Sequence, residues 1–253
     1  MKLPSFLFFV LWVCIASAQS DDREELIRQY YNILNKTDVV SGMKFYQDRV
    51  QYHLSSSDTI NAIQDSRMVA IATFNLGMYD QCEQVTVRAL EWALGMPRDT
   101  VMQDAISGLN NQLGEVYRAH RQYERSLTYY KRALEFSLTH RDSAVYINNI
   151  ALTTRDMGEL EEAVSYFEQA YRMSLTTDDT ISWARTLDNW GYAQSMAGNE
   201  SAVYKMEEAL DMRLQRDDLP GLYASYFHLA EHYIRLGDTL YAMDYAEKAK
   251  AVA

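Results

Sequence analysis

One pattern of small and apolar residues recurs five times along the chain, and this repetition constrains the fold more than any other feature. The windows that carry it are SRMVAIATFNLGMYDQCEQVTVRAL (66–90), NNQLGEVYRAHRQYERSLTYYKRAL (110–134), INNIALTTRDMGELEEAVSYFEQAY (147–171), LDNWGYAQSMAGNESAVYKMEEAL (187–210) and YFHLAEHYIRLGDTLYAMDYAEKAK (226–250). Their starts lie 37 to 44 residues apart. Repetition at such a period is typical of stacked supersecondary units, each of which buries its apolar face against its neighbours.

Small residues recur at three positions of the pattern, where they let two helices approach closely. The three sets are Ala70, Gly114, Ala151, Gly191 and Ala230; Cys82, Ser126, Ala163, Ala202 and Ala242; and Ala89, Ala133, Ala170, Ala209 and Ala249. A further position, between the first two sets, holds Gly77, Arg121, Gly158, Gly198 and Gly237. Glycine there suits a left-handed residue that ends a helix. Each unit is therefore predicted to be a helix A, a turn and a helix B.

The repeats are expected to fill residues 19–253 as one all-α domain. Their predicted limits are about 23–57, 60–97, 100–141, 142–178, 180–217 and 219–252. The first repeat is the weakest, with an amphipathic helix over Glu24–Asn35 and a second over Gly42–Leu54. Acidic turns between units, which include Asp58, Asp99, Asp142 and Asp179, are suited to capping the next helix A.

Residues 1–18 differ in kind from the rest of the chain. Lys2 is followed by an apolar run from Phe6 to Ile15 and by Ala16-Ser17-Ala18. This order is typical of a secretory signal peptide, and the run is short for a membrane span. We therefore expect an exported protein, periplasmic or extracellular, that does not insert in the membrane after cleavage. An uncleaved N-terminal anchor is the alternative.

Charge and cysteine content narrow the classes of partner. The formal net charge is -11 at pH 7, which argues against nucleic acid and against anionic lipid headgroups. Cleavage after Ala18 removes Cys14 and leaves Cys82 alone, so no intramolecular disulfide is expected. Because Cys82 falls on a small-residue position, a buried structural thiol is a better interpretation than a nucleophile.

The repeat pattern resembles the tetratricopeptide repeat family. Leu113-Gly114-x-x-Tyr117, followed by Tyr123, Ser126, Tyr130 and Ala133, follows that family's motif order. The resemblance covers about residues 23–252 and implies a right-handed solenoid of about six helix-turn-helix repeats. The longer repeats behind a signal peptide look like the extracytoplasmic tetratricopeptide region of Bacteroides-like sensor regulators.

The resemblance also implies that helix A lines a concave face on which peptides or protein segments bind. The positions of helix A that would contact such a ligand hold Asn111, Glu115, Arg118, Asn148, Leu152, Arg155, Asp188, Tyr192, Ser195, Glu231 and Arg235. Asparagine amides can hold a peptide backbone, because they donate and accept together, and Arg118 and Arg155 can pair with a carboxylate. Alternatively, these side chains only bond the neighbouring repeat or face solvent.

One motif indicates chemistry instead. His228, Glu231 and His232 form an H-x-x-E-H string, which on a helix matches the inverted zinc-protease pattern. The string lies in frame inside the last repeat, where its residues are explained without metal. We therefore predict no enzyme, no metal and no cofactor, and rank a metal-dependent hydrolase last. Three alternatives stay open: a protein that binds a peptide or protein segment, a sensory input module that relays binding to a membrane signalling partner, and an architectural scaffold.

Overall fold

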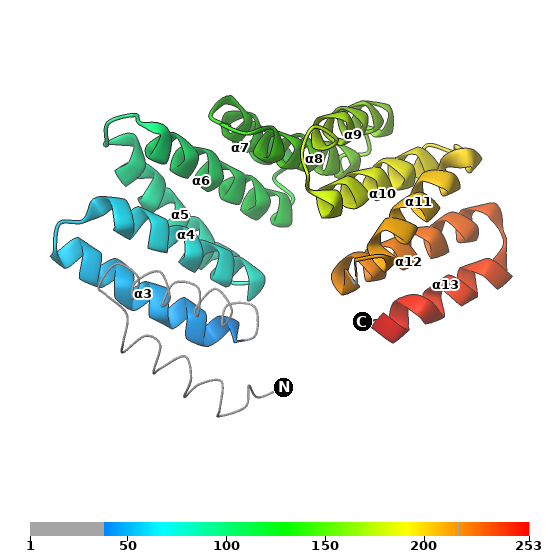
Figure 1. The fold of residues 1–253 in the computed structure, drawn as a ribbon, viewed down its shortest axis with the longest axis horizontal. Coiled ribbons are helices and arrows are strands. Elements are labelled where there is room, and N and C mark those ends of the chain that lie inside the picture. Colours follow the sequence, from blue (N-terminus) through cyan, green and yellow to red (C-terminus); the bar gives the residue numbers. More distant parts are fainter. Residues whose placement is uncertain (1–37, 217, 253) are drawn as a thin grey trace. The chain divides into compact units, whose positions relative to one another are not determined.

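The computed structural model describes residues 38–216 and 218–252. The predicted signal peptide and the predicted helix Glu24–Asn35 lie outside these residues. The described residues form α-helices joined by short turns, with one 3₁₀ turn and no strand among them, and consecutive helices pack in pairs (Figure 1). The all-α, repeat-based fold class is thereby confirmed. The chain divides into two compact units, Met1–Ala93 and Leu94–Ala253.

In unit 1 the described part consists of α3 (Val39–Ser55), α4 (Thr59–Asn75) and α5 (Tyr79–Leu94). Helix α3 packs against α4 around Tyr46, which is fully buried. The buried thiol of Cys82 on α5 donates to the carbonyl of Ala70 on α4 over 3.2 Å. Cys82 is therefore a packing residue at a helix crossing, as the small-residue position predicted.

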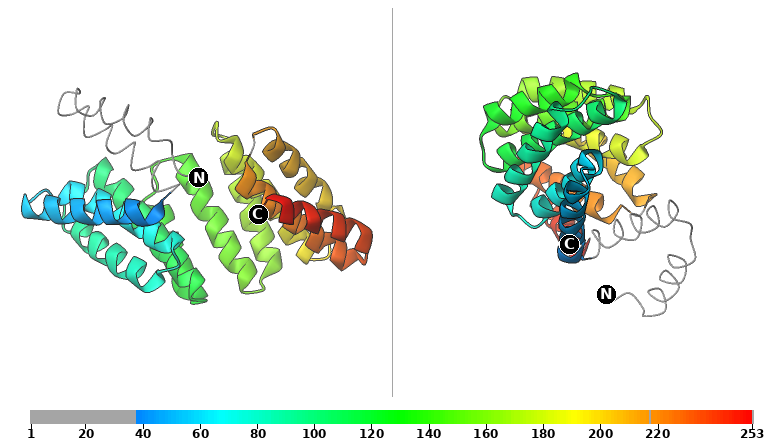
Figure 2. Two further views of the ribbon diagram at one scale, coloured as in Figure 1. Left: turned by 90° about the horizontal axis from the view of Figure 1, so that it is seen from below. Right: turned by 90° about the vertical axis from the view of Figure 1, so that its left-hand side faces the viewer.

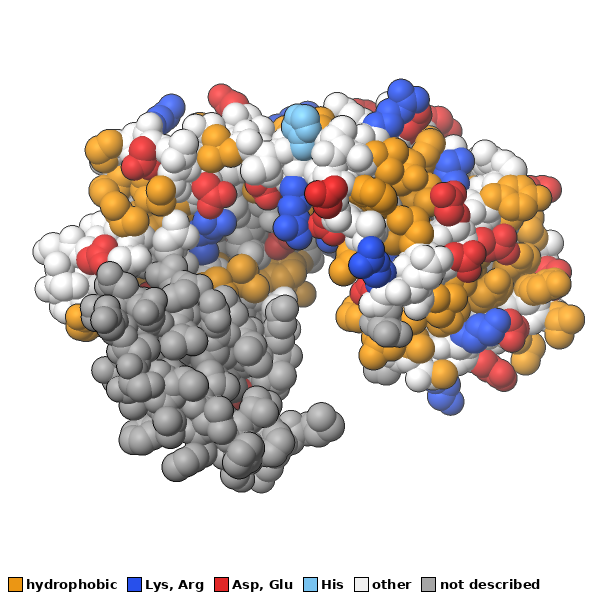
Figure 3. All heavy atoms as spheres, in the orientation of Figure 1, with side chains coloured by type: hydrophobic (Ala, Val, Ile, Leu, Met, Phe, Trp, Pro, Cys, Tyr) orange, Lys and Arg blue, Asp and Glu red, His pale blue; other side chains and the backbone are white. Residues whose placement is uncertain are grey.

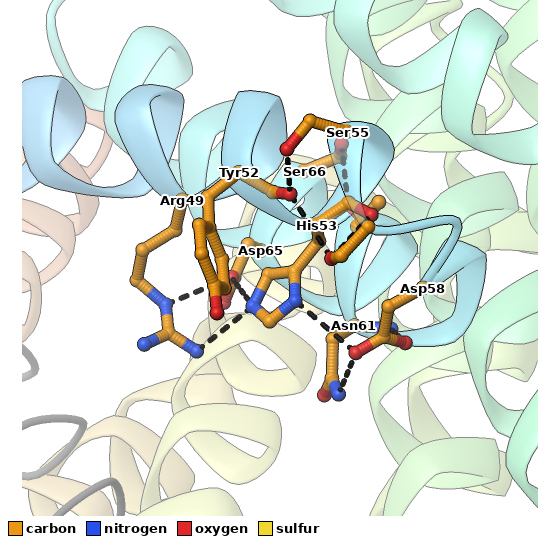
Figure 4. Close-up of polar contacts among 10 residues, drawn as sticks. Arg49, Tyr52, His53, Ser55, Asp58, Asn61, Asp65 and Ser66 are labelled. Carbon is orange, nitrogen blue, oxygen red and sulfur yellow. Dashed lines mark hydrogen bonds and ion pairs between the residues drawn. The ribbon is translucent and has the colours of Figure 1, made fainter.

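A buried polar cluster also joins α3 to α4 (Figure 4). Arg49 Nε donates to Asp65 Oδ2 over 2.9 Å, and a second guanidinium nitrogen of Arg49 lies 3.2 Å from His53 Nε2. His53 Nε2 also lies 3.4 Å from Asp65 Oδ2, and its Nδ1 faces Asp58 Oδ2 at 3.1 Å. Two residues one turn apart on α3 thus contact Asp65 within α4 and Asp58 at the N-cap of α4.

Unit 2 contains four helix pairs. The A helices are α6 (Thr100–Ala119), α8 (His140–Asp156), α10 (Thr180–Met196) and α12 (Leu219–Leu236). The B helices are α7 (Tyr123–Glu135), α9 (Leu160–Ser174), α11 (Val203–Leu214) with a 3₁₀ turn before it (Glu200–Ala202), and α13 (Thr239–Val252). No described helix of either unit is long and apolar enough to span a membrane.

The helices of unit 2 form two layers, which the views of Figures 1 and 2 show from different sides. Each A helix packs on the B helix of its own repeat, and each B helix packs on the next A helix. Consecutive A helices also contact one another directly, whereas contacts between consecutive B helices are sparser. The layer of A helices is therefore the more crowded, inner layer, and we call its surface the inner face.

The small-residue positions lie where the helices cross. At Gly114, an added Cβ atom would come within 2.5 Å of the ring of Tyr130, which is itself fully buried. The second and third sets behave alike: Ser126, Ala163, Ala133 and Ala170 have no exposed surface. Close packing of helix A on helix B depends on these residues, as the sequence predicted.

Helix ends follow the predicted chemistry with two differences. Gly77, Gly158, Gly198 and Gly237 have positive φ, and Arg121 adopts the same left-handed conformation with φ 59°. Asp58, Asp99 and Asp179 cap their helices as expected. The prediction for Asp142 was wrong, because Thr139 caps α8 and its hydroxyl bonds Asp142 Oδ2 at 2.6 Å. Asp142 instead accepts from the Thr139 hydroxyl with its side chain, and its backbone N–H donates to that hydroxyl over 3.0 Å.

Candidate functional site

Amide side chains connect the A helices of unit 2 across the inner layer. Asn149 Nδ2 on α8 donates to Asn111 Oδ1 on α6 over 2.9 Å. Asn189 Nδ2 on α10 donates to Asn148 Oδ1 on α8 over 3.1 Å. Each bond links one repeat to the next, so these residues set the spacing of the A helices. Asn111 remains partly exposed beside this ladder, but Asn148 is only 2% exposed.

Asp188 also lies beneath the inner face, because its side chain has no exposed surface. Its Oδ2 atom accepts from Arg213 of α11 over 3.0 Å and from His228 Nδ1 of α12 over 3.0 Å. Direct ligand contact, predicted for Asn148 and Asp188, is incompatible with this burial. We assign both a positioning role, since their side chains hold neighbouring helices together.

Arg118 and Arg155, which share a position in the repeat, share a partner as well. Arg118 Nε donates to Asp156 Oδ2 over 2.8 Å, and a terminal nitrogen of Arg155 donates to Asp156 Oδ1 over 3.1 Å. Their side chains are 30% and 15% exposed. Two arginines of neighbouring A helices thus meet on one carboxylate, which the sequence analysis missed. Figure 3 shows basic and acidic side chains gathered in the region of α8 and α10.

Tyr192 lies at the centre of a second group of residues, contributed by three A helices. Its ring stacks on His228 of α12, with ring centroids 4.0 Å apart and planes at 11°. The guanidinium carbons of Arg155 on α8 and Arg235 on α12 lie 5.5 Å and 5.2 Å from the centroid of the same ring. These are cation–π distances. We call Arg155, Tyr192, His228 and Arg235 the Tyr192 cluster.

Arg235 has further contacts that hold it in place. One terminal nitrogen donates to Ser195 Oγ over 3.1 Å, and another lies 3.5 Å from Glu231 Oε2. Ser195 Oγ also lies 2.7 Å from His232 Nδ1. Burial, reinforced by nearby Arg235, lowers the pKa of His232. Neutral His232 therefore accepts from the Ser195 hydroxyl, which in turn accepts from Arg235.

Glu115 and Leu152 occupy one position of the repeat in different surroundings. Glu115 accepts from Asn111 over 3.3 Å and from Gln112 over 3.0 Å. Burial raises the pKa of Glu115 in spite of these bonds and of the field of Arg118 and Arg185. Arg185 lies on α10, so charges two repeats apart act on each other, which the sequence analysis did not foresee. Leu152 is partly exposed and packs against the core around Phe167.

The H-x-x-E-H string does not gather its side chains at one point. His228 bonds Asp188, His232 bonds Ser195, and Glu231 faces Arg235. Both histidines are buried, His232 to 2% exposure. In the described part of the chain, no group of three His, Cys, Asp or Glu side chains is arranged to hold a metal ion. Both histidine rings instead hold other side chains in place. His228 stacks on Tyr192, and His232 bonds Ser195, which accepts from Arg235.

The arrangement has the chemistry of a surface that binds anions and hydrogen-bonding groups. Asn111, Arg118, Arg155, Tyr192 and Arg235 all remain at least partly exposed on A helices. Arginine forks pair with planar carboxylates, and amides match the donors and acceptors of a peptide backbone. These five residues were all predicted to contact a ligand. Three more of the predicted residues, Glu115, Leu152 and Glu231, are also partly exposed on the inner face.

Comparison with known families supports the repeat assignment. Residues 104–176 match the tetratricopeptide repeat family model. Together with the solved structures of similar fold, this match confirms the resemblance to tetratricopeptide repeat proteins. No curated protein sequence is significantly similar to the chain. The narrower resemblance to Bacteroides-like sensor regulators stays a prediction.

Three solved structures illustrate the similarity of fold. BtubC (BKLC) from P. vanneervenii has a TM-score of 0.65 and 19% identity, over 85% of this chain and 88% of that one. The Rap conjugation gene regulator of the plasmid pLS20, in complex with the Phr* peptide, has a TM-score of 0.68 and 19% identity over 93% and 63%. The quorum sensor NprR from B. thuringiensis has a TM-score of 0.66 and 16% identity over 83% and 59%. The chain thus spans less than two thirds of the length of the pLS20 Rap regulator and of NprR.

Proposed function

We propose that the protein binds an extended peptide or protein segment along the inner face of unit 2 and has no enzymatic activity of its own. The observation that carries the proposal is the sharing of one face by the amide ladder and the arginines. Asn111 is linked to Asn149, and Arg118 and Arg155 meet within the same layer on Asp156. Backbone-binding amides beside carboxylate-binding arginines match the chemistry of a polypeptide.

The fold adds support of a general kind. The pLS20 Rap regulator, with the same repeat architecture, was solved in complex with a peptide, and NprR is described as a quorum sensor. A solenoid of helix pairs offers a long surface whose spacing is fixed by its repeats. A short peptide and a segment of a larger protein are both compatible with such a surface.

A sensory input module is the second candidate function. The description of NprR as a quorum sensor favours it, because a sensor has to couple the binding of a ligand to an output. In this candidate function, the binding event is relayed to a membrane signalling partner. We further propose that the protein is exported, on the evidence of Lys2, the apolar run Phe6 to Ile15 and Ala16-Ser17-Ala18.

Site-specific photo-crosslinking tests the inner face directly. A photoreactive amino acid replaces Arg118 on α6 in one variant and Arg172 on α9 in a control. Both arginines are exposed, at 30% and 76%, but Arg118 lies on an A helix and Arg172 on a B helix. Each variant is irradiated with envelope extract and with culture supernatant, and the adducts are weighed by mass spectrometry.

We expect polypeptide adducts at position 118 and none above background at position 172. An adduct mass of a short peptide favours the sensor, and the mass of a whole protein favours a scaffold or segment-binding protein. Equal capture at the two positions, or capture only at position 172, would show that the inner face is not the binding surface.

A further inference from the structure

We propose that the Tyr192 cluster is a carboxylate-binding site, in which Arg155 and Arg235 hold an acidic group of the bound polypeptide above Tyr192. This inference rests on the proposed function and specifies the class of ligand. The two arginines come from α8 and α12, on either side of α10, yet both guanidinium carbons lie within 5.5 Å of the Tyr192 ring centroid. An anionic group that reached both guanidinium groups would gain charge-assisted hydrogen bonds from each of them.

The ring that carries the site is fixed from below. His228 stacks on Tyr192 with ring centroids 4.0 Å apart, and its Nδ1 donates to Asp188 Oδ2, which also accepts from Arg213. Asp188 and Arg213 are 0% and 3% exposed, so this support is part of the core. The binding group above is therefore preorganised, which lowers the entropy lost when a ligand binds.

The two arginines are held in place but not neutralised. Arg235 has the neutral Ser195 at 3.1 Å and its nearest carboxylate, Glu231, at 3.5 Å. Arg155 has Asp156 at 3.1 Å, but that carboxylate has a shorter bond, 2.8 Å, to Arg118. Three arginines therefore share two carboxylates. This local excess of positive charge lies in a chain whose net charge is -11.

Asp156 shows the chemistry that the site prefers. It is a carboxylate of this chain, bound by two arginines of successive A helices. A carboxylate from a bound segment would compete with Asp156 for Arg155 and gain Arg235 in addition. Asp156 therefore acts as an internal competitor, and removing its charge should strengthen the binding of an acidic ligand.

Fluorescence anisotropy with short labelled peptides tests the proposal on the full chain that follows Ala18. The first probe alternates Ala and Glu and has a free C-terminus, the second is the same peptide with an amidated C-terminus, and the third has Gln in place of Glu with a free C-terminus. Binding of the first two indicates side-chain carboxylates, and binding of the first and third indicates the terminal carboxylate. The net negative charge of the protein disfavours general attraction of these probes.

We expect Arg155→Gln/Arg235→Gln to weaken binding by about tenfold or more, because two charge-assisted contacts are lost. Asp156→Asn should tighten binding, and raising the salt concentration should weaken it in the wild type. Arg172→Gln, on α9 and paired with Glu168 of the same helix, is the matched control and should leave binding unchanged. Circular dichroism establishes that each variant is folded.

Charge reversal keeps the test decisive if the double Gln variant is unstable. Arg155→Glu/Arg235→Glu should lose the acidic probes and bind a peptide that alternates Ala and Lys. The inference is overturned if no acidic probe binds the wild type, or if the double Gln and charge-reversed variants bind the acidic probes as the wild type does. Crosslinking at position 118 that persists in the double Gln variant would leave the proposed function standing and refute the carboxylate site alone.

Discussion

Two buried clusters in this protein are built from the same three residue types, and their difference shows how a repeat fold makes a functional site. In unit 1, Arg49 and His53 reach Asp65 from a single helix (Figure 4). In unit 2, Arg213 and His228 reach Asp188 from two different helices. The first cluster joins α3 to α4. The second joins α10, α11 and α12, and it also supports Tyr192.

The two clusters differ in what their histidines contact. His228 bonds Asp188 and also stacks on the partly exposed side chain of Tyr192, so only the carboxylate of unit 2 is linked to the inner face. Asp65 has Arg49 beside it, whose side chain is still 14% exposed and can turn to solvent. The arginine that bonds Asp188 has no such access to solvent, because the side chain of Arg213 is only 4% exposed. Loss of either carboxylate should therefore have unequal consequences.

The largest expected effect is that of Asp188→Ala. The substitution removes the carboxylate that accepts from buried Arg213 over 3.0 Å and leaves Arg213 with the longer carboxylate contact of its Nε with Asp218 Oδ2, at 3.8 Å. It should lower the free energy of unfolding by about 3 kcal/mol. Urea unfolding followed by circular dichroism measures it. Binding at the inner face should weaken too, since His228 loses its anchor under Tyr192. A loss below that of the matching change in unit 1 would contradict the comparison.

Asp65→Ala is that matching change and should cost about 2 kcal/mol, because Arg49 can recover hydration while His53 keeps Asp58 as a neighbour. The same urea titration checks it. Binding of the segment to unit 2 should be unaffected. Reduced binding in this variant, with unit 2 folded, would mean that the cluster of unit 1 is more than a structural join.

A smaller, opposite effect is expected where a left-handed residue is not glycine. Arg121 and Ser57 end helices with φ 59° and 60°. Arg121→Gly in unit 2 and Ser57→Gly in unit 1 should each raise stability by about 1 kcal/mol, because glycine adopts this conformation without steric cost. Thermal unfolding of both variants measures the gain. Gly158→Ala, at a position with φ 89°, is the reverse control and should destabilise.

The smallest expected effect is a difference in how stability varies with pH. Hydrogen bonding from Asn61 lowers the pKa of Asp58 in unit 1, and burial raises the pKa of Glu115 in unit 2. Asp58 therefore adds stability above its ordinary pKa of 3.8 and loses it as the pH falls. Glu115 favours the folded state when protonated and detracts from stability as the pH rises above its ordinary value of 4.5.

Asp58→Asn should accordingly be less stable than the wild type at neutral pH and approach it in acid. Glu115→Gln should be more stable than the wild type at neutral pH, with the gain shrinking in acid. Melting temperatures from acid to neutral pH test both signs. A neutral-pH loss in Glu115→Gln would mean that the ionised carboxylate is favoured by Arg118 and Arg185 over its burial cost.

Local features of the fold could be predicted from the sequence because they depend on neighbours in the chain. A glycine that ends a helix depends only on its own backbone conformation, which is left-handed at these positions. Asp58, Asp99 and Asp179 each cap a helix that begins at the next residue. The N-cap Thr139 was missed because Asp142, which lies in the first turn of α8, is also a residue type that caps helices. The difference is only three residues along one helix.

The inner face was predicted in part, for a reason that concerns the rotation of each helix. Asn148 was expected to contact a ligand, but it is buried and accepts from Asn189, while its neighbour Asn149 bonds Asn111. The repeated Gly and Ala positions align the helices of the repeats with one another. This alignment does not decide which of two adjacent residues, such as Asn148 and Asn149, faces the ligand surface. Whether either residue is exposed depends on how closely the next repeat packs.

The repeat pattern by itself determined that this chain folds as stacked helix pairs, because small residues and left-handed glycines act within a unit. Only the tertiary structure decided which side chains form a site. Arg155, Tyr192 and Arg235 belong to three different repeats and meet because their A helices are in contact. The two histidines of the H-x-x-E-H string likewise became supports of that site, since their partners, Asp188 and Ser195, lie 40 and 37 residues away in the chain.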